Sequence, residues 1–284
     1  MEPDRQLVVK SNHIIEASYR LSVAEQRVIL SAIAQVRRDQ PKVTDAVLYS
    51  VTAAELAELC GTDPKTAYRD LQNAAERLQT RRVTLILEPD GVTIRTKRRR
   101  VTCWVQSVDY IDQEGRIELR FGKDILPYLT GLQREFTRYA LSDVAKMTSA
   151  HAIRLYELLM QWPEGHRVVE LDDLRRWLQL EDRYPSIKDF KRRVLDPAVE
   201  QINEHSPLML TWSQRKTGRK VTHLAFDYAK KQPTKAVGKA PAKRKAGKLT
   251  DADIAQQARP GESWEAARTR LNQIPLELPE EAIS

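Results

Sequence analysis

The chain has 284 residues, enough for two domains of ordinary size. Hydrophobic residues make up 41% and charged residues 30%, and no apolar run approaches the roughly 20 residues of a membrane helix, so a transmembrane protein is excluded. The N-terminus lacks the apolar stretch of a secretory signal, and we therefore expect a cytoplasmic protein. Cys60 and Cys103 are too few for a disulfide scaffold and lack the CxxC spacing of a zinc site.

The net charge of +8 is unevenly distributed along the chain. Residues 1–229 contain 36 bases and 32 acids, residues 230–248 contain eight bases and no acid, and residues 249–284 contain three bases and seven acids. Because the 230–248 segment has almost nothing to bury, we expect residues 230–284 to form a disordered basic linker and a mostly flexible tail. Two roles stay open for the linker: a non-specific phosphate-binding arm or a solubilising spacer.

The first strong helix signal is a capping box. Ser22 and Glu25 have the required spacing, and apolar residues follow at helical intervals up to Val36. This pattern predicts a core helix.

A helix-turn-helix is predicted next. An extended stretch at 47–51 precedes a short amphipathic helix at 52–60, which Gly61 ends. Asp63 as N-cap and Pro64 at the first helical position then begin a second helix with one apolar stripe. Two helices joined by a turn that contains Gly are typical of this motif.

After this helix the pattern changes to the alternation of strands. Residues 83–87 and 92–94 flank a Pro-Asp-Gly turn, which predicts a hairpin or wing. A longer pair of strands, 101–111 and 116–121, is expected to extend the same sheet.

The order of elements then repeats. The second set comprises helices at 149–162, 171–180 and 186–205, a short strand at 168–169, and strands at 208–212 and 222–226 around a polar loop at 213–221. We therefore predict an α+β fold of two tandem, pseudo-symmetric winged-helix domains, 1–128 and 136–229, joined by a short connection around Tyr128 to Tyr139. Four tryptophans fall within patterned elements and are expected in the core, namely Trp104, Trp162, Trp177 and Trp212.

Candidate DNA-binding residues lie mainly in the second repeat. The first half of the 186–205 helix contains Lys188, Lys191, Arg192 and Arg193. Residues near the N-terminus of a recognition helix can enter the major groove, where Arg and Lys donate to guanine and to flanking phosphates. The polar loop adds Arg215, Lys216, Arg219 and Lys220, with Gly218 allowing a tight turn. Pro197 removes one backbone donor and is expected to bend this helix or to end a segment of it.

The first repeat is less basic. Its second helix offers Lys65, Thr66 and Arg69 as candidate DNA contacts. A basic run beyond the first hairpin offers Arg98, Arg99 and Arg100, where alternation along a strand would direct some side chains to phosphate and others to solvent.

Sequence signatures of catalysis are missing. The five histidines form neither an HxH pair nor HExxH, and no GxxxxGK[ST] motif is present, which disfavours a metal-dependent nicking enzyme, a zinc protease and a P-loop ATPase. We expect no cofactor, no metal and no enzymatic activity.

Several sequence segments resemble those of the Rep initiator proteins of theta-replicating, iteron-containing plasmids. These segments occur in the family's order over about residues 7–229. They are Val9 to Asn12, Ile14 to Val36, Phe136 to Leu141, Ala152 to Leu159, Asp189 to Leu195 and Gly218 to Val221.

The resemblance implies more than the residue patterns do. Members of this family have two winged-helix domains; monomers bind directly repeated iterons at the origin, and dimers repress their own gene at an inverted repeat. The resemblance assigns the main base contacts to the second domain and auxiliary contacts and much of the dimer interface to the first. It also implies origin opening with recruitment of a host initiator ATPase and the replicative helicase. The alternative is a winged-helix transcriptional repressor without a replication role.

Overall fold

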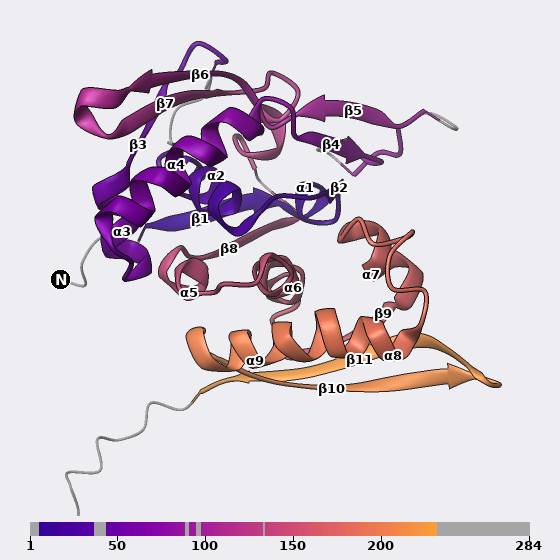
Figure 1. Cartoon of the computed structure of the whole chain (residues 1–284). Helices are drawn as coiled ribbons and strands as arrows, with labels where there is room; N and C mark the ends of the chain where they lie inside the picture. The colour runs from indigo at the N-terminus through magenta and orange to yellow at the C-terminus, as the bar shows by residue number, and fades with distance from the viewer. Residues whose placement is uncertain (1–5, 37–43, 89–90, 95–97, 133, 232–284) are drawn as a thin grey trace, which may run out of the picture. The chain divides into compact units, whose positions relative to one another are not determined.

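The computed structural model describes residues 6–36, 44–88, 91–94, 98–132 and 134–231 of the chain (Figure 1). The predicted basic linker and tail lie outside these residues, apart from Lys230 and Lys231. The Pro89-Asp90 part of the predicted hairpin turn also lies outside them. Within the described ranges, no helix is both long enough and apolar enough to cross a membrane.

The first half of the chain is a mixture of short strands and helices. It contains β1 (Leu7–Ser11), α1 (Asn12–Ile15), β2 (Ser18–Tyr19), α2 (Val23–Ala34), β3 (Tyr49–Thr52), α3 (Ala53–Cys60), α4 (Pro64–Leu78), β4 (Arg82–Leu85), β5 (Arg100–Cys103), β6 (Val105–Ile111), η1 (Asp112–Glu114), β7 (Arg116–Phe121) and η2 (Leu126–Tyr128).

Local signals in the sequence determine where its helices begin and end. The Ser22 hydroxyl accepts from the Glu25 N–H at 3.2 Å, and the Glu25 carboxylate accepts from the Ser22 N–H at 2.8 Å, which confirms the predicted capping box. Gly61 ends α3 in a left-handed conformation with φ of 66°. Asp63 caps α4 by accepting from the Thr66 N–H at 3.1 Å. The predicted helix-turn-helix is therefore confirmed as α3 and α4.

Apart from β1, the strands of this half form two separate three-stranded antiparallel sheets, ordered β2-β4-β5 and β3-β7-β6. The prediction of one continuous strand at 101–111 is wrong, because the chain changes sheet at Trp104. The Trp104 N–H donates to the Arg81 carbonyl beside β4, and the Trp104 carbonyl accepts from the Gly122 N–H after β7. With its indole fully buried, Trp104 joins the two sheets, so the second hairpin does not extend the first sheet.

The first wing also differs from the prediction. The predicted return strand at 92–94 makes a single bridge, between Leu87 and Thr93. The main partner of β4 is β5, with Val83 opposite Thr102. Val92 is 59% exposed, so this part of the hairpin gains too little from burial to form a longer ladder.

The second half repeats the arrangement. It contains β8 (Phe136–Ala140), α5 (Ser142–Ala145), α6 (Ala150–Met160), β9 (His166–Glu170), α7 (Leu171–Trp177), α8 (Ile187–Phe190), η3 (Lys191–Leu195), α9 (Asp196–His205), β10 (Leu208–Thr217) and β11 (Lys220–Lys230). Its sheet has the order β10-β11-β9, and Figure 1 shows α8 and α9 lying along β10 and β11. The predicted helix at 186–205 is present as α8, η3 and α9 in succession.

Pro197 alters this helix without ending it. It occupies the first turn of α9, directly after η3, which is a π-helical turn. In this turn the Asp196 N–H donates to the Lys191 carbonyl, five residues back. The wider turn relieves the contact that a proline ring makes with the preceding turn of an α-helix, so the helix continues through Pro197.

Two other expectations for the second half are wrong. The predicted polar loop at 213–221 is mostly strand, because β10 and β11 pair up to Thr217 and Lys220 and leave a two-residue turn. Their outer residues have no core to cover, so they lack the apolar alternation that predicts a strand. Trp162 is 47% exposed, since α6 ends at Met160 and the indole lies beyond the core-facing turns.

The two halves share structure at the connection between them. β1 pairs with β8 in an antiparallel two-stranded sheet, with Val8 opposite Tyr139. One contiguous hydrophobic core contains residues of both halves, from Val8 to Phe226. Residues on both sides of the predicted connection therefore pack together, and the division at 128–136 stays a prediction.

Candidate nucleic-acid interface

The second recognition helix presents four basic side chains at its N-terminal end. Lys188, Arg192 and Arg193 are exposed. Arg192 is 3.3 Å from the Asp189 carboxylate, but both side chains face solvent, so this pair costs little to separate. Lys191 is half-buried, and its ammonium lies 5.4 Å from the centre of the Trp212 ring, a cation–π contact with β10. Three of the four predicted residues are thus free to reach a ligand, and the fourth attaches the helix to the hairpin.

The hairpin of β10 and β11 supplies the second group of predicted residues. Arg215, Lys216, Arg219 and Lys220 are all exposed near its tip. Gly218 has φ of 62°, which confirms that the turn uses the left-handed conformation that glycine favours. The structure therefore brings these four bases together on one protruding wing, close in sequence to the end of the recognition helix.

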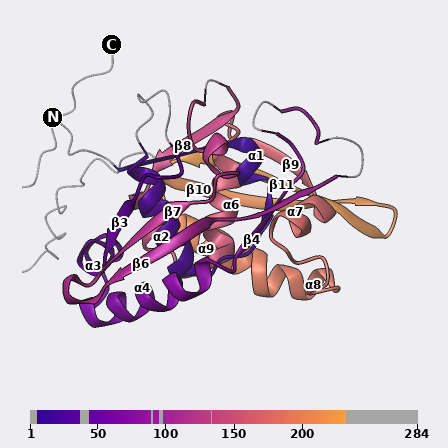
Figure 2. The same ribbon diagram turned by 90° about the horizontal axis from the view of Figure 1, so that it is seen from above.

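The predicted residues of the first half lie at the start of α4 and at the start of β5. Lys65 and Arg69 are exposed, and Thr66 is half-buried with its N–H bonded to Asp63. Figure 2 shows α4 and α8 along the same side of the described chain, at the lower edge of that view. The two recognition helices can therefore face one duplex.

The three arginines of the basic run at the start of β5 differ in their contacts. Arg98 and Arg99 are exposed, whereas the Arg100 guanidinium forms two hydrogen bonds of 2.6 and 3.0 Å with the Glu88 carboxylate. That carboxylate already compensates the charge of Arg100. Arg98 and Arg99 are the members of this run that could contact phosphate.

A buried ionic cluster joins the two halves, and the residue patterns do not predict it. Glu157 forms ion pairs with Lys10 and with Arg154, and all three side chains are almost fully buried. Tyr139 also donates to Glu157. Burial alone would raise the pKa of Glu157, but Lys10 and Arg154 outweigh it and hold this pKa below its usual range.

Arg154 extends this cluster into the backbone of other elements. Its Nη2 donates to the carbonyls of Ile15 at 2.7 Å, Ala17 at 3.1 Å and Trp177 at 3.2 Å. The cluster contains residues from three sequence segments that carry the family resemblance, namely those with Lys10, Tyr139 and Arg154. Sequence segments that carry the family resemblance therefore contribute to the contact between the two halves.

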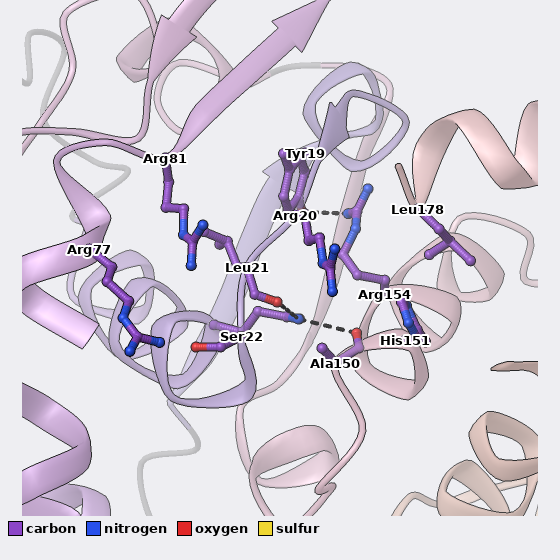
Figure 3. A pocket seen from close by; sticks show the side chains of 11 residues that line it. Tyr19, Arg20, Leu21, Ser22, Arg77, Arg81, Ala150, His151, Arg154 and Leu178 are labelled. Carbon is purple, nitrogen blue, oxygen red and sulfur yellow. Dashed lines mark hydrogen bonds between the residues drawn. The ribbon is translucent and has the colours of Figure 1, made fainter. Parts of the chain in front are cut away.

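A cavity of about 340 Å³ opens beside this cluster, and we call it the junction pocket. Its lining comes from the segment before α2, the end of α4, the start of α6 and the end of α7 (Figure 3). The lining residues are Tyr19, Arg20, Leu21, Ser22, Gln26, Arg77, Arg81, Ala150, His151, Arg154 and Leu178. Residue patterns could not reveal this pocket, because its basic side chains belong to separate parts of the chain.

The described ranges show no grouping of three or more His, Cys, Asp or Glu side chains that could hold a metal ion. The basic surfaces are thus the chemically distinctive feature of this part of the chain. Their neighbours are exposed side chains and helix ends, an arrangement suited to polyanion binding.

Comparisons with known proteins agree with the tandem arrangement. Residues 7–160 match the family model described as "Initiator Replication protein, WH1", and residues 170–228 match "Initiator Rep protein, WH2". The two matched segments correspond to the two winged helices in chain order.

Two curated relatives come from Escherichia coli. A replication initiation protein is 27% identical over 228 residues, covering 78% of this chain and 68% of the relative. The PI protein is 23% identical over 248 residues, covering 76% and 80%.

A solved structure has the same fold. The Pi initiator protein, crystallised in complex with iteron DNA, aligns with a TM-score of 0.68 and 21% identity over 81% of this chain and 99% of that one. The fold therefore agrees with the two family matches, and the chain belongs to the initiator replication protein family, with two winged helices in tandem.

Proposed function

We propose that this protein initiates plasmid replication by binding directly repeated iterons at the origin as a monomer. The observation that carries the proposal is the exposed basic end of the second recognition helix, with Lys188, Arg192 and Arg193, beside a basic wing. Membership of the initiator family supports the replication role, and the iteron DNA held by the similar Pi initiator supports the choice of ligand.

The two winged helices have different roles in this proposal. The second one, within 136–229, contacts base edges. The first one, within 1–128, adds DNA contacts through Lys65, Thr66, Arg69, Arg98 and Arg99, while Arg100 stays paired with Glu88. The first also provides much of a homodimer interface, and the dimer represses the protein's own gene at an inverted repeat.

Two linked modules favour both binding and opening of DNA. When α4 and α8 face one duplex, binding of the first module raises the effective concentration of the second. Bending of the repeated DNA then stores strain that helps to melt an adjacent AT-rich segment. The protein further recruits a host initiator ATPase and the replicative helicase, without catalysing a reaction itself.

The test is a DNase footprint of the purified protein on the DNA that flanks its gene, with the mass of the complex measured by light scattering. Protection of several direct repeats by monomers is the expected result. Protection of an inverted repeat alone, by dimers, would instead support a winged-helix repressor without a replication role.

The recognition helix can be tested by substitution. Arg192→Ala and Arg193→Ala are each expected to weaken binding to the protected repeat by about 1–3 kcal/mol if the side chain contacts a base. Fluorescence anisotropy with labelled duplexes measures the change. Arg138→Ala, an exposed arginine on β8, is the control for loss of one charge. Unchanged affinity in both helix variants would remove this helix from the interface.

A further inference from the structure

The junction pocket carries an excess of positive charge. Its lining contains Arg20, Arg77, Arg81, His151 and Arg154, and none of its lining residues is Asp or Glu. Figure 3 shows the guanidinium groups of Arg77 and Arg81 on one side of Ser22 and that of Arg20 on the other side. These groups come from α4, from the residue before β4 and from the segment before α2, so the fold brings them together.

Only part of this charge is balanced by neighbouring carboxylates. Arg81 forms hydrogen bonds of 2.7 to 3.0 Å with both oxygens of Glu25, and Arg154 is paired with Glu157. By contrast, no described carboxylate lies within ion-pair distance of Arg20 or Arg77, and both are exposed. Two guanidinium groups at the pocket are therefore available for an anion from outside the described chain.

Two helices add to the positive potential. α2 and α6, with 12 and 11 residues, both begin at the pocket, where Ser22 and Ala150 line it. Their N-terminal dipoles favour negative charge. Gln26 fixes the two helix starts together, since its amide nitrogen donates to the carbonyls of Leu21 at 3.2 Å and Ala150 at 3.1 Å. The two helix N-termini are thus held in place around one space.

The pocket lies between the two helix-turn-helix units. Arg77 is in the last turn of α4, the recognition helix of the first unit. Leu178 caps the C-terminal end of α7, the helix that precedes the second recognition helix. When two recognition helices on one side of a molecule occupy successive major grooves, the sugar–phosphate backbone between those grooves passes across the space between them.

We propose that the junction pocket binds one phosphate group, which the DNA backbone supplies where it passes between the two recognition helices. Arg20 and Arg77 donate to the phosphate oxygens, because guanidinium groups match phosphate geometry. The DNA source of the phosphate rests on the function proposed above, whereas the capacity to bind phosphate rests on the pocket alone. A free phosphate compound has the same chemistry and is separated from DNA by the experiment.

The first arm of the experiment removes phosphate charges from the DNA. Duplexes of the footprinted site are made with a single neutral methylphosphonate at each position between the two protected grooves. The full-length protein is expected to lose roughly tenfold in affinity at one or two of these positions, as for loss of a charge-assisted hydrogen bond. The double variant Arg20→Gln and Arg77→Gln is expected to bind all these duplexes equally.

Matched variants separate the pocket from folding and from total charge. Arg138→Gln is expected to keep the wild-type profile. The double variant Arg20→Lys and Arg77→Lys retains both charges and is expected to lose affinity at the same positions, by a smaller factor because an ammonium group lacks the bidentate geometry. The melting temperature of each variant confirms that it is folded. Identical methylphosphonate profiles for the wild type and the double Gln variant would overturn the DNA source.

The second arm uses inorganic phosphate and pyrophosphate with the DNA-free protein. Burial, followed by Arg20 and Arg183, lowers the pKa of His151 from 6.5 to about 4. A bound phosphate would offset the positive charge of the two arginines, so it is expected to raise the pKa of His151. The imidazole NMR signals report this pKa, and chloride at equal ionic strength is the control. A different outcome is that phosphate raises the His151 pKa in the wild type and not in the double Gln variant, while both proteins have the same methylphosphonate profile. This outcome would identify a free phosphate compound as the ligand.

The two proposals fail separately. A wild-type protein without any footprint would refute the proposed function, while the phosphate titration would still test the pocket. A normal footprint with no response in either arm would refute the pocket and leave the proposed function in place.

Discussion

Glu157 lies between two buried cations, Lys10 and Arg154, so the cluster contains one negative and two positive charges. Removing the anion leaves two like charges without compensation in a medium of low polarity. Removing Lys10 instead leaves a matched ion pair, which retains the hydrogen bonds of Arg154 to three carbonyls. The two ends of one ion pair are thus expected to differ in their importance for stability.

Glu157→Gln is expected to lower the free energy of unfolding by about 3–5 kcal/mol, the range for breaking a buried pair. Lys10→Met is expected to lower it by less. Urea unfolding of both variants measures the difference. The double variant, with Arg154 alone left in the cluster, tests whether the two effects are additive. Equal effects, or a larger one for Lys10→Met, would contradict this account of the charge balance.

At the scale of elements, the wing of β10 and β11 depends on its turn. Gly218 has φ of 62°, and a Cβ atom at this position would meet nothing within 4 Å, so a substitution acts through backbone strain alone. The four exposed bases of the wing lie on both sides of this turn. The turn therefore determines whether the bases are held in one arrangement.

Gly218→Val is expected to open the end of the hairpin, at a local cost of roughly 1–2 kcal/mol. Faster hydrogen exchange at the amides of Thr217 and Lys220 would show the opening, with weaker DNA binding and an unchanged midpoint of global unfolding. Gly218→Asn is the control, since Asn tolerates left-handed backbone. Unchanged exchange in the Val variant would show that the turn does not hold the wing together.

Helix positions could be predicted because their signals are local. The Ser22 capping box and the Asp63-Pro64 start act within a few residues, and both are confirmed by hydrogen bonds. The division at Trp104 could not be predicted, because apolar residues alternate on both sides of it. Its cause is the bonding of Trp104 to Arg81 and Gly122, which belong to other segments of the chain.

In the candidate site, too, only features that depend on residues close in sequence could be predicted. The bases of α8 and of the second wing are close together in sequence, so their clustering could be predicted. The junction pocket combines Arg20, Arg77 and His151, which only the packing of the two halves brings together. The basic neighbours of Arg100 predict a DNA contact, whereas its pairing with Glu88 depends on the geometry of the hairpin and could not be predicted.

At the scale of the whole molecule, the basic linker can be tested through its charge alone. Six of its bases lie at positions 235–248: Lys235, Lys239, Lys243, Arg244, Lys245 and Lys248. Replacing all six by Gln keeps the length of the chain. If the linker binds phosphates, the sequence preference should stay the same, while the slope of log affinity against log salt falls by about 0.9 for each phosphate that the variant no longer neutralises.

The measurement is the affinity for specific and unrelated duplexes over a range of salt concentrations. A second variant that lacks residues 233–284 tests the linker and the tail together. Its sequence preference is expected to persist, because the predicted DNA contacts all lie before residue 230. Equal slopes for the six-Gln variant and the wild type would identify the linker as a spacer.

The pairing of β1 with β8 has a consequence for synthesis of the protein on the ribosome. β1 leaves the exit tunnel before its partner, Phe136–Ala140, which is translated more than a hundred residues later. At ordinary rates of translation, roughly ten seconds separate the synthesis of β1 from that of β8. During that time the backbone donors and acceptors of β1 can pair with other chains on the same messenger RNA, and the β1–β8 sheet cannot form until translation of the second half has begun.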